Sequence, residues 1–113
     1  MDELLKTAVK ACEEKLAEHI TVLDFRNVSP ICDYFVICDV DNNRKLLAVC
    51  DNVEDRLAEA GYDTRIEGDK DSSWILIDAH DVCVHVFLRE NRAFYNLEKL
   101  WMDVPRMNPD EIV

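Results

Sequence analysis

Glycine and proline are scarce in this chain of 113 residues, which has two glycines and three prolines. The scarcity excludes a collagen-like chain and a chain built of glycine- or proline-rich linkers. No apolar run approaches the roughly 18 residues that a membrane span requires. Met1-Asp2-Glu3 is acidic and has no signal-peptide pattern, so we expect a cytoplasmic protein. At this length a single domain can bury about two-thirds of its unfolded surface.

Basic residues are fewer than acidic ones in this chain. Lysine and arginine number 13 against 24 aspartates and glutamates, a formal charge of −11. Binding to phosphates needs a basic surface that displaces counterions, so the charge argues against direct nucleic-acid binding. It favours a basic protein partner and an association that weakens with salt. Acidity that serves solubility alone is the open alternative.

The cysteines form no Cys-x-x-Cys motif, and their number, five, is odd. Each lies within an apolar pattern, which predicts reduced core thiols in a reducing compartment. The histidines show no metal-ligand spacing either. We therefore expect no disulfide framework, no zinc site and no cofactor.

Hydrophobic periodicity predicts one α/β domain with elements in the order α-β-β-α-β-β-β-α. The expected architecture is a mixed sheet of about five strands flanked by helices. We assign residues 1–103 to the domain and 104–113, which contain two prolines and no periodicity, to an extended or frayed tail. The expected helices cover 2–18, a segment capped by Asp41, Asn42 or Asn43 and ended by Gly61, and 91–101, where the last buries Ala93, Phe94, Leu97, Leu100 and Trp101; the strands cover 20–25, 33–38, 62–66, 74–78 and 81–88.

The stretch from Trp74 to Trp101 organises the rest of the chain. Its two strands are rich in β-branched and aromatic residues, and Ala79-His80 between them could form a two-residue hairpin loop. That loop would pair Asp78 with Asp81, Leu76 with Cys83 and Trp74 with His85. A core face would then carry Ile75, Ile77, Val82, Val84 and Val86, and a second face would carry Trp74, Leu76, Asp78, Asp81, Cys83, His85 and Phe87.

The second face mixes large apolar groups with ionisable ones, as a surface that meets a partner does. Two other interpretations stay open on the pattern alone. Helices could cover both sides of the sheet. The Trp74–His85 pair could also be a packed aromatic contact with no binding role.

Several spaced motifs resemble the ribosomal silencing factor family, also called the Iojap or RsfS family. They are Val22-Leu23-Asp24, Asp33 to Ile37 (DYFVI), Glu67-Gly68, Trp74 to Asp78 (WILID), Asp81 to Phe87 (DVCVHVF) and Arg92 to Trp101. Together they cover roughly residues 3–103. Two turns depart from the family pattern: His80 stands where the family usually has glycine, and the segment from Cys38 to Lys45 replaces a turn rich in glycine, serine and threonine.

The resemblance implies a binding factor, not an enzyme. Members dock on the large ribosomal subunit through ribosomal protein fourteen, on the face that meets the small subunit, and so block subunit joining and repress translation. Trp74 and Leu76 would then form the apolar anchor. Asp78 and His85 would be its polar partners and Glu67 a charge at the rim. Arg92 matches the family's arginine and could orient this surface or lie on a solvated helix face. Family members can also form homodimers.

The rival interpretation is an enzyme. The family is similar in fold to nucleotidyltransferases, and Asp39-x-Asp41 could hold a divalent ion at a strand end. No Gly-Ser phosphate loop precedes this pair, so a solvated strand end leading to a helix cap is the stronger interpretation. His85 could act as a general base oriented by Asp78 or Asp81, but no suitable nucleophile accompanies it.

Overall fold

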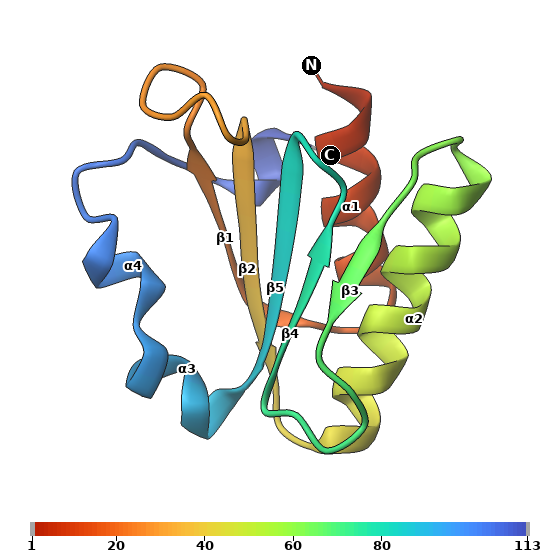
Figure 1. Ribbon diagram of the computed structural model, residues 1–113. Helices are drawn as coiled ribbons and strands as arrows, with labels where there is room; N and C mark the ends of the chain where they lie inside the picture. Colours follow the sequence, from red (N-terminus) through yellow and green to blue (C-terminus); the bar gives the residue numbers. More distant parts are fainter. Residues whose placement is uncertain (1, 113) are drawn as a thin grey trace.

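The computed structural model describes residues 2–112, without the side chains of residues 93–95, 97 and 98. Its centre is a mixed sheet of six strands in the order β3-β4-β5-β2-β1-β6 (Figure 1). Only the central pair, β2 and β5, runs parallel. The strands are β1 (Glu18–Asp24), β2 (Tyr34–Val40), β3 (Arg65–Glu67), β4 (Trp74–Asp78), β5 (Val82–Leu88) and β6 (Arg106–Met107).

Two amphipathic helices cover one face of this sheet (Figure 1). Helix α1 (Glu3–Glu14) begins at Asp2, whose side chain caps the backbone N–H of Leu5. Helix α2 (Asn43–Glu59) begins at Asn42, one of the three predicted caps. Gly61, with φ of +89°, follows the end of α2 as predicted. No described helix is both long enough and apolar enough to cross a membrane.

The core face of the central hairpin is as predicted. Side chains on this face pack against α1 and α2 in one apolar cluster. The members that the two strands contribute are all at most 2% exposed: Ile75, Ile77, Val82, Val84 and Val86. The cysteines are free thiols, and all except the half-buried Cys83 are buried.

The register of the hairpin corrects the prediction by two residues. Leu76 pairs with His85 and Trp74 with Phe87, because the turn lies at His80-Asp81 instead of Ala79-His80. His80 has φ of +68°, and the hydrogen bond from Asp81 N–H to the Ala79 carbonyl closes a γ-turn around it. A slip of two residues returns every side chain to its original face, so both predicted faces keep their members.

The predicted helix over 91–101 is two short helices. Helix α3 (Arg89–Tyr95) ends at Asn96, whose φ of +43° breaks the axis, and α4 (Leu97–Leu100) follows. Leu100 is 69% exposed, so its predicted burial is wrong. Trp101 packs against an apolar cluster on the second face of the sheet. The side chains of Ala93, Phe94 and Leu97, also predicted to be buried, lie outside the described part.

The tail, expected to be extended or frayed over 104–113, packs against the sheet. Residues Arg106–Met107 form β6, which pairs with Val22 and Leu23 at the edge of the sheet. A 3-10 helix (Pro109–Glu111) follows. Val104 and Ile112 are at most 5% exposed, so the tail contributes to both apolar clusters. The physical reason is that β1 would otherwise be an unpaired edge.

Candidate functional site: the second face of the sheet

One row of side chains crosses the second face from β3 to β1. Successive strand pairings align Glu67 with Leu76, Leu76 with His85, His85 with Ile37, and Ile37 with Thr21. Exposure falls along this row from Glu67 to the buried His85 and Ile37. The β3 and β4 part of the face is therefore accessible, and the β5 and β2 part is covered.

Helices α3 and α4 lie on this side of the sheet (Figure 1), and Trp101, which follows them, packs against the apolar cluster there. Trp101 packs edge-on against Phe25, with ring centroids 5.2 Å apart. Phe25 in turn contacts Phe35, at 4.5 Å. Around these aromatic side chains, Ile31, Leu100 and Met102 are each at least 69% exposed. The second face is thus partly sealed and bordered by exposed apolar side chains.

Trp74 lies on the accessible side of this border. Its ring stacks on the ring of Phe87, with centroids 5.2 Å apart, and remains partly exposed. The indole N–H donates a hydrogen bond of 3.1 Å to His85 Nδ1. Gly68 lies behind it, with φ of +118°; a Cβ there would be 3.0 Å from Ile75 and 3.2 Å from the Trp74 carbonyl. The Glu67-Gly68 motif therefore allows β3 and its loop to approach Trp74 closely.

His85, expected as a polar partner beside the apolar anchor, is buried, at 5% exposure. Its ring lies between aromatic neighbours, with centroids 4.5 Å from Phe35 and 5.7 Å from Trp74. Burial lowers the pKa of His85 to about 4, so the ring is neutral at pH 7. At pH 7 the buried His85 is therefore a neutral ring that packs between aromatic side chains and accepts the Trp74 hydrogen bond.

The surface is hollowed on both sides of the Leu76–His85 pair. One hollow, of about 420 Å³, is lined by Glu67, Gly68 and Trp74 together with this pair. The other, of about 210 Å³, extends from the same pair towards Cys83, Phe35 and Trp101 and is mostly apolar. We call them the Trp74 hollow and the Trp101 hollow.

Acidic side chains surround the accessible half of the second face. The Glu67 side chain is 63% exposed and lies 3.9 Å from Arg65. The Asp78 side chain is 26% exposed, accepts the backbone N–H of His80 and lies 3.6 Å from Arg65. Asp81 is exposed in the hairpin turn. These three carboxylates outnumber the one neighbouring cation, Arg65, so this side of the accessible half carries net negative charge.

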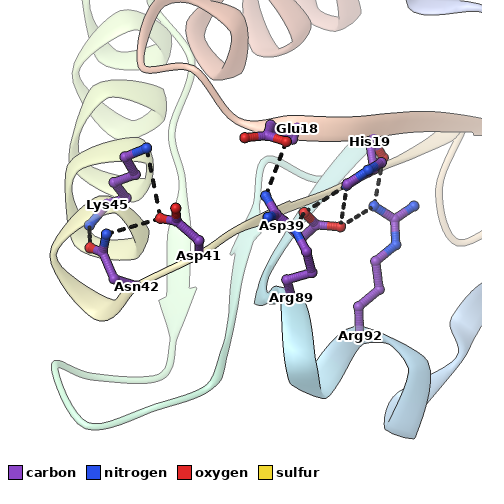
Figure 2. Close-up of polar contacts among 8 residues, drawn as sticks. All are labelled: Glu18, His19, Asp39, Asp41, Asn42, Lys45, Arg89 and Arg92. Carbon is purple, nitrogen blue, oxygen red and sulfur yellow. Dashed lines mark hydrogen bonds and ion pairs between the residues drawn. The ribbon is translucent and has the colours of Figure 1, made fainter.

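A separate charged cluster lies around Asp39, at the end of β2 (Figure 2). The Asp39 carboxylate is 3% exposed and accepts hydrogen bonds from His19 at 2.9 Å, Arg89 at 3.0 Å and Arg92 at 3.0 Å. Arg92 also donates to the His19 carbonyl and to the Thr21 hydroxyl. An irregularity in the pairing of β1 with β2 and the φ of +53° at His19 accompany this arrangement.

This cluster fastens α3 to β1 and β2. Burial alone raises the pKa of Asp39, but the hydrogen bonds from His19, Arg89 and Arg92 outweigh it and lower the pKa overall. Asp41, the second carboxylate of the enzyme hypothesis, is exposed and lies 3.7 Å from Lys45 (Figure 2). Among the described residues, no group of three or more His, Cys, Asp or Glu side chains is arranged to hold a metal ion. The two carboxylates make different contacts. Asp39 binds the arginines of α3, and Asp41 contacts Asn42 and Lys45 at the start of α2.

The structure brings together Glu67, Trp74, Leu76, Asp78 and His85 on the second face. It does not bring Arg92 to them, since Arg92 is held in the Asp39 cluster with its side chain 12% exposed. Sequence reasoning missed the contributions of Phe35, Ile31 and Trp101 to this surface. The odd-numbered positions of the DYFVI strand were the available signal for Phe35, because alternate strand residues share a face.

Comparison with known proteins identifies the family of this chain. The model of the family described as "Ribosomal silencing factor during starvation" matches residues 1–113, the whole chain. The chain belongs to the ribosomal silencing factor family. A relative in this family, the "Ribosomal silencing factor RsfS" of Bacillus subtilis, is 40% identical over 108 residues, which cover 95% of this chain and 92% of the relative.

Other members of the silencing factor family extend the likeness. The chloroplastic protein Iojap of Zea mays is 37% identical over 93 residues, which cover 81% of this chain and 40% of the maize protein. A crystal structure of a protein from Chromobacterium violaceum is similar, with a TM-score of 0.85, 35% identity and coverage of 90% and 88% of the two chains. One from Bacillus halodurans gives a TM-score of 0.83 at 38% identity, covering 94% and 97%. The family likeness expected from the motifs is confirmed.

Proposed function

We propose that this silencing factor acts in the cytoplasm by binding the large ribosomal subunit through a basic protein, ribosomal protein fourteen, on the face that meets the small subunit. Bound there, it prevents the subunits from joining and represses translation without catalysing a reaction. The observation that carries the proposal is the accessible half of the second face, where Trp74 and Leu76 are partly exposed beside the acidic groups Glu67 and Asp78.

The chemistry of this surface suits a basic partner. A buried aromatic or aliphatic anchor surrounded by polar groups is the usual arrangement of a protein interface, and the anchor provides most of the binding energy. Glu67, Asp78 and Asp81 add negative charge beside the anchor. In a chain with a net charge of −11 they would steer a basic protein towards the apolar centre.

Trp74→Ala tests the proposal. Removing the indole deletes a large, partly exposed apolar group from the accessible half of the second face, so binding to purified large subunits should be lost in co-sedimentation. Tyr62→Ala is the matched control, because Tyr62 is also a partly buried aromatic but packs against the cluster on the opposite, helix-covered side. It should bind as the unchanged chain does.

Two measurements complete this test. Circular dichroism should show that both variants keep the fold. Sizing of the unbound chain shows whether the same face pairs with a second copy when no ribosome is present. Unchanged co-sedimentation of a folded Trp74→Ala variant would remove the proposed interface.

A further inference from the structure

The hydrogen bonds of His85 determine its tautomer. The indole N–H of Trp74 is a donor only, so His85 Nδ1, 3.1 Å away, must accept with its lone pair. In a neutral imidazole the other nitrogen then carries the proton. His85 Nε2 is therefore an N–H donor, and this atom is buried with no hydrogen-bond partner among the described residues. A buried, unpaired donor is rare and costs stability, which indicates a partner supplied from outside.

His85, the residue that carries this donor, lines the Trp101 hollow. The wall of the hollow also includes Phe25, Phe35, Leu76, Cys83 and Trp101. The volume, about 210 Å³, is larger than the roughly 150 Å³ of an apolar cavity able to hold a benzene ring. Ordered water needs two to four polar partners, and the mostly apolar wall provides few of them, so an apolar group can displace it favourably.

We propose that the Trp101 hollow receives one large apolar side chain of the docking protein, and that a backbone carbonyl next to this side chain accepts the hydrogen bond of His85 Nε2. The inference rests on the proposed function and adds a second anchoring point to it, separate from Trp74. The apolar side chain of the docking protein would fill the apolar space of the hollow. The backbone carbonyl would accept the hydrogen bond that the buried donor lacks.

A protein fits this hollow better than a free small molecule does. The apolar surface continues beyond the mouth, because Ile31 is 85% exposed and Leu100 and Met102, on either side of Trp101, are 69% and 70% exposed. A small molecule would leave these groups in water, whereas a protein surface covers them. The Trp101 hollow also shares Leu76 and His85 with the Trp74 hollow, so one partner can occupy both.

Cys83→Leu tests the inference by filling the hollow from its wall. Cys83 is half-buried and lines the Trp101 hollow but not the Trp74 hollow. Affinity for large subunits should fall at least tenfold, because the incoming side chain loses its space. Ala58→Leu is the control: it adds the same apolar side chain at an exposed position of α2, on the opposite side of the sheet, and should bind normally.

The two proposals fail in different ways. If folded Cys83→Leu binds normally while Trp74→Ala does not, the second face is the interface but the Trp101 hollow is not part of it, and the inference is overturned. If neither variant weakens binding, the proposed function itself fails and the inference with it. Loss of binding in both variants supports both proposals.

Nitrogen-15 NMR of the unchanged chain tests the donor directly and does not depend on any variant folding. The free protein should show His85 with a protonated Nε2 and an unprotonated Nδ1. On addition of the isolated basic ribosomal protein, the Nε2–H resonance should move to lower field as it gains an acceptor. If the Trp74 indole resonance reports binding while the His85 resonance stays in place, the carbonyl contact does not exist.

Discussion

His85 is a buried histidine to which we assign a role in binding at a cost in stability. Its ring is held neutral by burial and uses one nitrogen to orient Trp74. The other nitrogen has no partner among the described residues, which a chain selected for stability alone would avoid. We infer that this cost is retained because the donor is used on binding.

The free energy of unfolding should fall as the pH decreases from 6.5 to about 4. In this window the unfolded chain binds a proton at His85 that the folded chain does not, because burial lowers the folded pKa from 6.5 to about 4. The full effect amounts to about 3 kcal/mol. Urea unfolding between pH 7 and pH 4 measures it.

The control for this pH dependence is His85→Phe, which keeps a ring of similar size and cannot titrate. Its free energy of unfolding should fall less steeply with decreasing pH in the same window. The difference in slope should correspond to the uptake of about one proton on unfolding. Parallel curves for the two proteins would show that His85 is not the titrating group.

Asp39→Asn should lower the free energy of unfolding by about 2–3 kcal/mol, since it leaves Arg92 and its neighbours around an uncharged side chain in a buried position. The lowered pKa of Asp39 means that the charged form stabilises the fold above pH 3.8 and that this contribution is lost as the pH falls through the lower, folded pKa. Asp41→Asn, at a side chain 52% exposed, should change stability by about 0.5 kcal/mol or less. Equal effects of the two substitutions, by urea unfolding, would contradict the anchoring role.

At the scale of elements, the hairpin shows what sequence patterns can and cannot predict. Alternation of side chains placed Ile75 and Val84 on the core face and Trp74 and His85 on the other, and this assignment is confirmed. The turn was misplaced by one residue because alternation does not show which two residues form the loop: Ala79 pairs with Val82, which leaves His80, with φ of +68°, and Asp81 in the turn. The face on which a side chain lies repeats every two residues, so a register shift of two leaves it unchanged. The same shift gives every residue a different cross-strand partner.

His80→Gly should raise the free energy of unfolding by about 0.5–1 kcal/mol. His80 has φ of +68°, a conformation that costs an L-residue about 1–2 kcal/mol and glycine much less. His80→Ala is the control and should give no such gain, because alanine meets the same steric penalty. Thermal and urea unfolding of both variants measure the difference, and a gain with alanine as large as with glycine would show that the backbone is not the cause.

The helix break at Asn96 and the docked tail were not predictable in the same way. Helical spacing continues from Asn91 to Trp101, so the periodicity does not reveal that Asn96 adopts φ of +43°. The tail has no periodicity, and its burial depends on an open edge of β1 that exists only in the assembled sheet. Both features depend on tertiary contacts and not on local preference.

For the whole molecule, the sequence-derived family and fold class are confirmed, while the binding surface stays a prediction. Arg92 shows what a motif does not predict. It lies in the family motif from Arg92 to Trp101, but its side chain binds Asp39 and does not reach the accessible half of the second face. Composition predicted an acidic chain, and only the structure locates which acidic groups surround Trp74. Sequence alternation predicts which face of the sheet a residue lies on. Whether that residue is accessible depends on how α3 and Trp101 pack over the face.

The most direct test of the central claim is a subunit-joining measurement. Purified small and large subunits are mixed with the unchanged chain or with Trp74→Ala, and the fraction that assembles into whole ribosomes is read from a sucrose gradient. We expect the unchanged chain to lower this fraction and Trp74→Ala to leave it at the level without added protein. Equal inhibition by both proteins would contradict docking through the second face.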